Sequence, residues 1–315
     1  MGRSETGARP LLAGILCTVA TVALLMSLAG TAAAVTGGAP SPAGSPPLPG
    51  SPTGSPASGT ASAGAVSLVS ATISPRKSFY YGFRYPRLSY TIASTQPQND
   101  LRIDVVDVAG EAVRTFYRND VAPNATNAIR WDGSTNAKRP APNGRYSFRI
   151  SSQAGAIAAR PATASEAISL SFAFYGYTFP ILGAHDFGSA GARFGAARSG
   201  HTHQGQDVMA DCGLPLVAAR GGAVQYAGYE GNAGNYIVID GKGTTLDFMY
   251  AHLAQPSPLH TGDAVRTGQP IGIVGDTGDA TACHLHFEIW TAPGWYEGGS
   301  PVDPLPYLQK WDAYS

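Results

Sequence analysis

Four side chains in the second half of the sequence have the types and the spacing that metal-assisted hydrolysis requires. His203 and Asp207 belong to a His-Gln-Gly-Gln-Asp run, and His284 and His286 belong to a His-Leu-His run far downstream. A catalytic zinc ion takes three protein ligands, mostly from His, Asp, Glu or Cys, and keeps one position for water. The bound water has a pKa near ~7, so hydroxide is available to attack a carbonyl carbon. Three of these four side chains therefore predict an open zinc site.

The His-Leu-His run lies in a segment with the composition of a β-strand. Residues 281–290, Thr-Ala-Cys-His-Leu-His-Phe-Glu-Ile-Trp, are rich in aromatic and branched side chains. Successive side chains on a strand point to opposite faces, so His284 and His286 share one face and the apolar residues beside them share the other. Two imidazoles at this spacing can reach one reaction centre, although both need not bind the metal.

The other half of the predicted site needs a bend. His203 and Asp207 are too widely separated to share one strand face comfortably, so a bend at Gly205 must bring them together, and glycine has the backbone freedom for it. From His203 onward the sequence consists of short strand-like runs separated by turns, without the periodicity of a helix of ordinary length. This pattern favours an antiparallel all-β domain. The predicted strands are 222–227, 235–240, 245–250, 270–274 and 283–290.

The composition also favours a β-rich chain, and it excludes a charge-driven partner. The sequence has 315 residues, with 21 Lys and Arg against 21 Asp and Glu, 13% charged residues, 39 Gly and 24 Pro. A chain of this length can form two modest domains plus non-globular sequence. Abundant Gly and Pro with little charge are typical of turns and strands rather than of a helical bundle. Because the charges balance, nothing draws the chain toward nucleic acid or an acidic surface.

The N-terminus carries the pattern of an export signal. Arg3 and Arg9 precede an apolar run, Leu11–Leu28, and small residues up to Ala34 resemble a cleavage site. An uncleaved N-terminal anchor is the alternative, because the apolar run approaches the length that spans a bilayer. Both alternatives place the rest of the chain outside the cytoplasm. Residues 35–65 are nearly all Gly, Ala, Pro, Ser and Thr and cannot bury enough apolar surface to fold, so they predict a disordered linker.

Residues 66–153 have the strand pattern of one small β-sandwich. Leu101–Val108 alternates as a half-buried strand does, and Ala112–Tyr117 is the return strand of a predicted hairpin. Trp131 and Tyr146 are expected in the core or at a corner rather than in a ligand site. The runs GEAVRTF, WDG and PAPNGRYSFRI resemble the Ig-like domain of flagellar hook-capping proteins, a module that recurs in secreted bacterial enzymes.

Five runs follow one another in the C-terminal part over roughly residues 176–306: HTHQGQD, AGNYIVI, MYAHL, GIVGDTG and CHLHFEIW. In this order they resemble the lysostaphin-type zinc endopeptidases, which cut peptide bonds in bacterial peptidoglycan. The resemblance implies a compact antiparallel β-sheet domain with a long substrate groove and one Zn²⁺ on its floor. The residues that it implies are His203, Asp207 and His286 as metal ligands and His252 and His284 as catalytic histidines.

Proton transfer is the chemistry expected of the two catalytic histidines. The metal polarises the scissile carbonyl, and a nearby imidazole can remove or return protons and stabilise the oxyanion. The sequence leaves open which of His252 and His284 is the general base. Asn235 falls where the resemblance implies the groove wall, and it is expected either to bind the substrate backbone or to cap a turn.

The sequence does not favour a role in the site for the remaining histidines. His201 is close enough in sequence to compete with His203 as a ligand, but the spacing to Asp207 favours His203. His185 and His260 are expected to be ordinary surface residues or satisfied core residues.

Two cysteines flank the predicted site. Cys17 lies in the apolar N-terminal run, so the exported part keeps Cys212, which follows Asp207, and Cys283, which directly precedes His284. If both metal-bearing segments converge on one zinc ion, their cysteines come together as well, and this predicts a Cys212–Cys283 disulfide. The alternative is a thiolate ligand to zinc, for which the complete His, Asp and His set leaves no need.

The expected organisation has five parts. They are a signal peptide or anchor (1–34), a linker (35–65), an Ig-like β-sandwich (66–153), a connector (154–175) and a zinc endopeptidase domain (176–315). A strand over Ile168–Tyr177 is expected to enter the last domain. The expected partner is the peptide of peptidoglycan, with no nucleic acid, and with a membrane only through an uncleaved anchor.

The leading functional prediction is an exported zinc endopeptidase of the cell wall, without an assignment of the bond it cuts. One alternative is a non-catalytic wall-binding or hydrolase-activating protein of the same fold. Another is a latent enzyme in which residues 179–200 or the Ig-like domain cover the groove and His185 or Asp186 occupies the position of the water.

Overall fold

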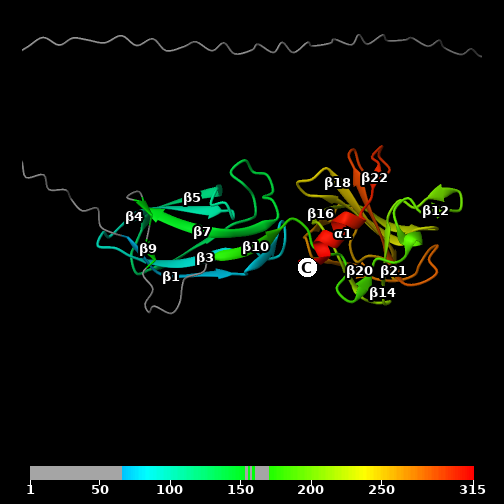
Figure 1. The fold of residues 1–315 in the computed structure, drawn as a ribbon, viewed down its shortest axis with the longest axis horizontal. Coiled ribbons are helices and arrows are strands. Elements are labelled where there is room, and N and C mark those ends of the chain that lie inside the picture. The colour runs from blue at the N-terminus through cyan, green and yellow to red at the C-terminus, as the bar shows by residue number, and fades with distance from the viewer. Residues whose placement is uncertain (1–65, 153–154, 157, 160–169) are drawn as a thin grey trace, which may run out of the picture. The chain divides into compact units, whose positions relative to one another are not determined.

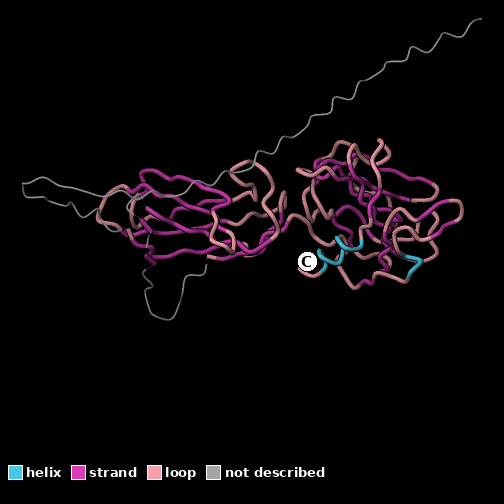
Figure 2. The backbone as a smooth tube through the Cα atoms, turned by 45° about the horizontal axis from the view of Figure 1, so that its top comes forward, coloured by secondary structure: helices cyan, strands magenta, loops and turns pink. Residues whose placement is uncertain are grey.

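The computed structural model describes residues 66–152, 155–156, 158–159 and 170–315 (Figure 1). The predicted export segment (1–34) and linker (35–65) lie outside these residues. Strands dominate the described chain, and its helices are two short segments, η1 (Ala190–Ala192) and α1 (Leu305–Asp312) (Figure 2). Within the described parts of the chain, no helix has the length and apolar character that crossing a membrane requires.

The described residues up to Tyr175 form two sheets around one core. The first sheet has the order β6 (Thr126–Arg130), β3 (Arg87–Ala93), β1 (Ser67–Ser74) and β9 (Ala158–Ala159). The second has the order β2 (Lys77–Phe79), β10 (Ser171–Tyr175), β7 (Gly144–Ser152), β4 (Asn99–Val106) and β5 (Ala112–Val121), with β8 (Gly155–Ala156) beside β7. The antiparallel β4–β5 pair is the hairpin that the sequence predicts.

An aromatic cluster fills the centre of this core. Trp131 is fully buried, with its ring centroid 5.0 Å from that of Tyr146 and 4.8 Å from that of Phe174. The core prediction for Trp131 and Tyr146 is therefore confirmed. The Trp131 indole also donates a hydrogen bond to the Ser134 carbonyl at 2.8 Å, which satisfies its one polar atom.

The expected connector differs from the structure at its C-terminal end. Ser171–Tyr175 does not enter the second domain as a strand of that domain. It is β10, which pairs with β7 and β2, and its residues Phe172 and Phe174 are buried in the first core. The physical reason is the alternation of aromatic and small side chains, which gives this strand an apolar face that complements the Trp131 cluster. The likeness to the hook-capping Ig-like domain stays a prediction.

The later residues form an all-β domain around an eight-stranded sheet. Its order is β11 (His185–Asp186), β14 (Gln206–Ala210), β21 (His284–Thr291), β18 (Leu246–Leu253), β17 (Gly234–Gly241), β16 (Gly222–Glu230) and β19 (Ala264–Val265), with β22 (Pro301–Val302) beside β21. A separate pair consists of β15 (Pro215–Val217) and β20 (Pro270–Ile273). All of these neighbours are antiparallel, and the five predicted strands are present as β16, β17, β18, β20 and β21.

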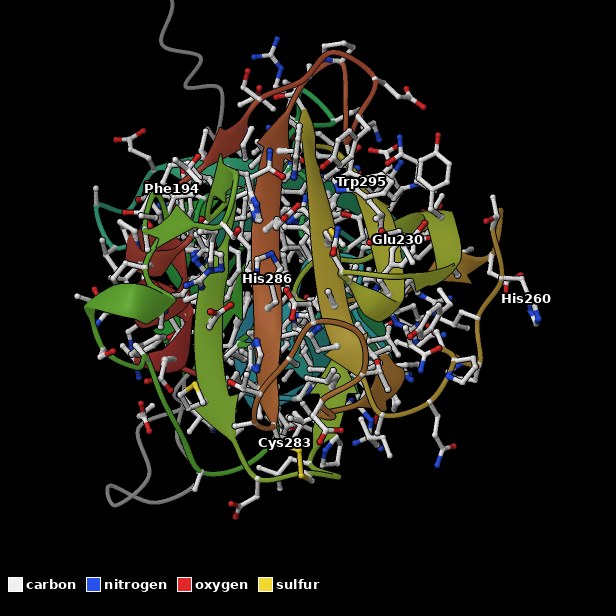
Figure 3. The ribbon with its side chains drawn as sticks, turned by 90° about the vertical axis from the view of Figure 1, so that its right-hand side faces the viewer. Phe194, Glu230, His260, Cys283, His286 and Trp295 are labelled. Carbon is white, nitrogen blue, oxygen red and sulfur yellow. A yellow bond between two sulfur atoms is a disulfide. The ribbon has the colours of Figure 1, made fainter. Side chains whose placement is uncertain are left out.

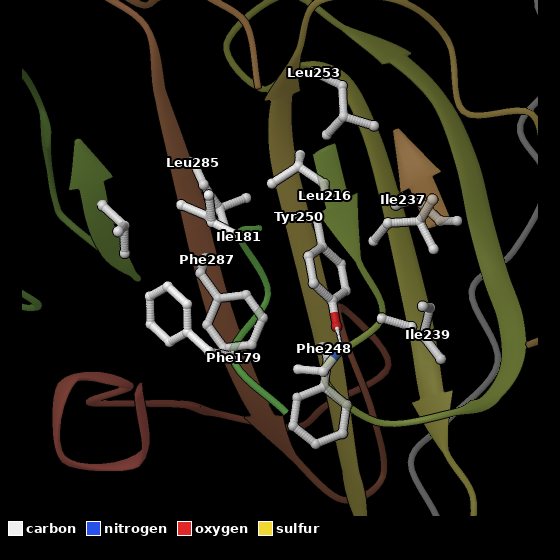
Figure 4. Packing of buried hydrophobic residues seen from close by; sticks show 14 of the residues in the cluster. Phe179, Ile181, Leu216, Ile237, Ile239, Phe248, Tyr250, Leu253, Leu285 and Phe287 are labelled. Atoms are coloured by element: carbon white, nitrogen blue, oxygen red, sulfur yellow. Dashed lines mark hydrogen bonds between the residues drawn. The ribbon is translucent and has the colours of Figure 1, made fainter. Parts of the chain in front are cut away.

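One face of the sheet packs into an apolar core. Leu285, Phe287 and Ile289 of β21 are fully buried, and Phe287 contacts Tyr250 of β18 at a centroid distance of 5.1 Å (Figure 4). The Tyr250 hydroxyl accepts a hydrogen bond from the Ala219 backbone N at 2.8 Å, so this buried polar atom is satisfied. This face fixes the strands in register, and the opposite face of the same strands is free to carry polar side chains.

The sequence did not predict α1. Leu308 and Trp311 of α1 are buried, and the Trp311 ring packs against Tyr177 in a stacked arrangement at 4.8 Å. This helix has eight residues, and only these two, three positions apart, are buried apolar side chains. Such a short segment shows no periodic pattern in the sequence.

Candidate metal centre

Three side chains bring one ligand atom each to a common point on the polar face of the sheet. His203 Nε2 lies 3.0 Å from Asp207 Oδ1 and 3.0 Å from His286 Nδ1, and the last two atoms are 2.9 Å apart. Ligand atoms about 2.0–2.2 Å from a tetrahedral zinc ion lie about 3.3 Å from one another. Two imidazoles and one carboxylate at this separation therefore fit three of the four positions of a tetrahedral zinc ion.

The sheet register explains how these residues meet. Asp207 of β14 lies directly opposite His286 of β21 in the antiparallel pair. His203 lies just before β14, and Gly205 lies between His203 and Asp207 in the sequence. A Cβ atom on Gly205 would lie 2.6 Å from the Phe287 carbonyl oxygen and 2.9 Å from His286 Nε2. Gly205 does not have a positive φ, so it is required for close approach rather than for unusual backbone freedom.

The second ring nitrogen of each ligand histidine has a fixed partner. His203 Nδ1 donates to the Arg193 carbonyl at 2.8 Å, and His286 Nε2 donates to Glu288 Oε1 at 2.9 Å. Such partners hold the ring and its tautomer, so that the other nitrogen presents its lone pair to a metal. Glu288 is itself buried and accepts a hydrogen bond from the Trp290 indole at 2.6 Å.

The electrostatics of the cluster favour positive charge at its centre. Burial raises the pKa of Asp207, but hydrogen bonds from His203 and His286 outweigh burial and hold this pKa well below its usual value. Burial lowers the pKa of His286, but the hydrogen bonds to Asp207 and Glu288 outweigh it and raise this pKa to about 9. The carboxylates of Asp207 and Glu288 thus favour a positive charge on His286.

The two predicted catalytic histidines lie beside this cluster. His284 Nε2 is 3.6 Å from Asp207 Oδ1, and the His252 ring is 4.6 Å from that of His284 and 5.8 Å from that of His286. His284 lies in β21 with His286, and His252 is at the end of β18, so neighbouring strands position both rings. In Figure 3, His286 lies near the middle of the sheet and Cys283 at the start of its strand.

Each of these two rings also has a fixed tautomer. His252 Nδ1 donates to the Thr277 carbonyl and His284 Nδ1 to the Ala282 carbonyl, both at 2.8 Å. In both rings Nε2 is therefore the nitrogen with the lone pair. Burial lowers the pKa of His252 to about 4, against the opposing hydrogen bond to Thr277, so this imidazole is neutral at pH 7. A neutral ring with a free Nε2 can accept a proton.

Two further residues contact the ligands. Arg198 of β12 (Ala197–Arg198), which pairs with β13 (His201–Thr202), places Nη2 2.9 Å from Asp207 Oδ2. No sequence signal connects Arg198 with Asp207. Glu288, by contrast, follows His284 and His286 at the same two-residue spacing, so strand alternation marks it as a further residue on the same face.

Asn235 does not have the contacts expected of a substrate-binding residue. Its side chain is 8% exposed, its Nδ2 donates to the Leu253 carbonyl at 3.2 Å, and its backbone N donates to Thr277 Oγ1 at 3.0 Å. The amide is thus used to join strand ends, which favours the structural alternative over substrate binding.

The other histidines lie outside the cluster. His201 is exposed, with Nδ1 near the Ser199 carbonyl at 3.2 Å, so it does not replace His203. His185 stacks on Phe179 at a centroid distance of 4.1 Å. His260 is exposed on a peripheral loop (Figure 3).

His185 and Asp186, which the latent-enzyme prediction places at the water position, have other contacts in the structure. His185 and Asp186 belong to the edge strand β11, where they pair with the outer side of β14. The Asp186 carboxylate accepts the Gly188 backbone N–H at 2.7 Å, and the His185 ring contacts the Gly183 carbonyl at 2.9 Å. Neither residue belongs to the group of three ligand atoms formed by His203, Asp207 and His286. Within residues 179–200, the Arg198 side chain contacts a ligand side chain, the Asp207 carboxylate.

Cys212 and Cys283 are joined as a disulfide, with their Cα atoms 5.3 Å apart. Cys212 follows β14 and Cys283 precedes β21, so the bond ties together the ends of the two strands that carry Asp207 and His286. A thiolate ligand to the metal is excluded by this pairing.

Residues 201–304 match the family model of Peptidase family M23. Over 87 residues the chain is 41% identical to peptidoglycan DD-endopeptidase ShyC of Vibrio cholerae, covering 28% of this chain and 20% of that protein. It is 34% identical over 114 residues to lysostaphin of Staphylococcus staphylolyticus, covering 36% and 23% of the two chains. The solved structure of lysostaphin from Staphylococcus simulans has a TM-score of 0.36 and 29% identity, over 40% of this chain and 50% of that one.

The chain therefore spans less than half the length of these two curated relatives, at 20% and 23%. A third relative, a lipoprotein NlpD/LppB homolog of Pseudomonas aeruginosa, is 33% identical over 132 residues, which are 42% of each chain.

Proposed function

We propose that this chain, whose residues 201–304 are an M23 peptidase domain, is an exported zinc-dependent endopeptidase that hydrolyses peptide bonds of bacterial peptidoglycan. The observation that carries the proposal is the complete set of five residues on one face of the sheet: His203, Asp207, His252, His284 and His286. The names of the relatives support the substrate class, since ShyC is a peptidoglycan endopeptidase by name.

The ligand set for one zinc ion per chain is His203 Nε2, Asp207 Oδ1 and His286 Nδ1. A zinc ion held in this way supplies a water of lowered pKa and polarises the scissile carbonyl. Arg198 holds the second oxygen of Asp207, and Glu288 holds His286, so that each ligand presents one atom.

His252 and His284 perform the proton transfers in this proposal. Each ring keeps its proton on Nδ1, against a backbone carbonyl, and has Nε2 free. Nε2 accepts a proton from the attacking water and can return it to the leaving amine. Once protonated, the same ring also stabilises negative charge that develops on the carbonyl oxygen. The apolar face of the sheet keeps both rings in place on rigid strands.

The test is digestion of purified sacculi and of defined peptidoglycan fragments, with mass analysis of the products. Wild type should release peptide fragments, and His284→Ala should lower kcat by roughly 10²- to 10⁴-fold while it keeps one zinc per chain. His260→Ala is the matched control, because that histidine is exposed and far from the cluster, and it should behave as wild type. Zinc-loaded wild type that leaves every fragment intact would support the non-catalytic regulator instead.

The proposal also includes export. N-terminal sequencing of the mature protein from the culture or envelope fraction should place its start near residue 35 if the segment is cleaved. Recovery of the intact chain with the membrane fraction would support the anchor, and recovery of the intact chain from the cytoplasm would contradict export altogether.

A further inference from the structure

One loop supplies the hydrogen-bond acceptors for both predicted catalytic histidines. Residues 275–283, here called the 275–283 loop, connect β20 to β21. The Thr277 carbonyl accepts from His252 Nδ1 and the Ala282 carbonyl accepts from His284 Nδ1, both at 2.8 Å. The direction of each ring and the location of its proton therefore depend on the position of this backbone.

The Thr277 hydroxyl bonds the loop to the two strands behind it. Thr277 Oγ1 donates to the Leu253 carbonyl at 2.7 Å and accepts from the Asn235 backbone N at 3.0 Å. Leu253 directly follows His252 in β18. The hydroxyl thus fixes the Thr277 carbonyl relative to the strand that carries the ring which this carbonyl orients.

The backbone next to Thr277 packs closely against the turn between β16 and β17. A Cβ atom on Gly278 would lie 2.3 Å from the Gly234 backbone N, and one on Gly234 would lie 2.3 Å from Thr277 Oγ1. The Asp279 backbone N also donates to the Asn232 carbonyl at 3.0 Å. At the other end, Cys283 is held by its disulfide to Cys212.

The consequence for the rings follows from imidazole chemistry. A neutral imidazole carries its proton on either nitrogen, and the hydrogen bond made by one nitrogen decides which nitrogen is free. If the Thr277 carbonyl moves, the Nδ1–H of His252 loses its partner, and the ring can rotate or take the other tautomer. Either change removes the Nε2 lone pair from the reaction centre.

We propose that Thr277 is a positioning residue, whose hydroxyl fixes the Thr277 carbonyl so that this carbonyl sets the tautomer and direction of His252. The inference rests on the proposed function, because the proposed function assigns His252 and His284 to catalysis. Thr277 itself contacts neither the ligand atoms nor the predicted water position.

Three variants of the full chain separate this role from a general effect on folding. Thr277→Val removes the hydroxyl and keeps the shape, Thr277→Ala removes it without adding a methyl group, and Thr277→Ser keeps it. Thr281→Val is the matched control, since Thr281 is exposed on the same loop. We expect Val and Ala to lower kcat by roughly 10- to 100-fold, with KM and zinc content unchanged, and Ser and the control to match wild type.

A second measurement does not depend on activity. Long-range ¹H–¹⁵N correlation spectra of the metal-free protein report the tautomer of each histidine. Wild type and Thr277→Ser should show His252 and His284 with the proton on Nδ1, whereas Thr277→Val should show His252 as a mixture or as the other tautomer. A Thr277→Val protein with wild-type kcat and wild-type tautomers overturns the inference, as does a Thr277→Ser protein as impaired as Thr277→Val.

The two proposals fail in different ways. If wild type hydrolyses no peptidoglycan fragment, the proposed function fails, and the tautomer measurement still tests the action of Thr277 on the rings. If wild type is active and the Thr277 variants keep its kcat and its spectra, only the positioning role fails.

Discussion

The two faces of strand β21 carry side chains with different roles. Leu285, Phe287 and Ile289 lie on one face, fully buried among other apolar side chains. His284 and His286 lie on the other, hydrogen-bonded or close to the Asp207 carboxylate. The apolar face provides free energy of folding, and the rigidity that results places the polar groups to within a fraction of an ångström. Changes on the two faces should therefore affect different measured quantities.

The largest effect is expected from removing a ligand on the polar face. Asp207→Ala deletes the carboxylate that both ligand histidines contact, so we expect less than one bound zinc per chain and no measurable hydrolysis. Metal analysis and the fragment digestion assay check this. Asp211→Ala, at an exposed carboxylate close in sequence, should keep both zinc and activity. An Asp207→Ala protein with a full zinc content would show that the metal lies elsewhere.

The apolar face should respond in stability instead. Phe287→Ala leaves a cavity beneath the metal centre and should lower the free energy of unfolding by about 3–5 kcal/mol. Urea denaturation of the metal-free protein, followed by tryptophan fluorescence, measures this change. Folded Phe287→Ala protein at low temperature should still bind zinc. An unchanged free energy of unfolding together with a lower zinc affinity would contradict the separate roles of the two faces.

A smaller effect is expected one position farther along the polar face. Glu288→Gln keeps the shape but removes the charge that holds the His286 Nε2–H, so zinc affinity should fall by roughly 10- to 100-fold. Competition with a chromogenic chelator measures this affinity. Glu297→Gln, at an exposed glutamate, is the control. Equal affinities for Glu288→Gln and wild type would mean that Glu288 serves only the fold.

The smallest effect is expected where a buried carboxylate has no chemistry to perform. Burial raises the pKa of Asp104 in β4, but hydrogen bonds from Thr115, Arg102 and Arg149 outweigh it and hold this pKa below its usual value. The stabilisation is therefore present above the unfolded-state pKa of about 3.9 and is lost as the pH falls through the folded-state pKa.

Asp104→Asn should accordingly destabilise the protein at pH 7, and its difference from wild type should shrink toward pH 3. Urea unfolding at the two pH values checks the sign. A difference that grows with acidity would contradict the assignment of the low pKa to this residue.

Strand alternation made much of the site predictable. The positions of His284 and His286 on one face follow from a period of two residues, and the same rule separates the Phe287 face from them. Likewise, the predicted convergence of both metal-bearing segments on one zinc ion, with a cysteine close to each, predicted the Cys212–Cys283 disulfide.

Contacts between segments without a shared pattern were not predictable. Arg198 reaches Asp207 from a two-residue strand, and no periodicity marks so short an element. Strand β10 has the alternation of any half-buried strand, so the sequence predicts the strand but not the sheet that it joins.

The ion pair between Arg198 and Asp207 has a consequence for metal selectivity. Because the guanidinium occupies Oδ2, the carboxylate can offer a cation only its other oxygen, beside two nitrogen donors. Calcium prefers six to eight oxygen ligands and often grips a carboxylate by both oxygens. Calcium would have to displace the arginine and would still lack most of its shell, whereas a small ion that accepts nitrogen and a single oxygen needs no rearrangement.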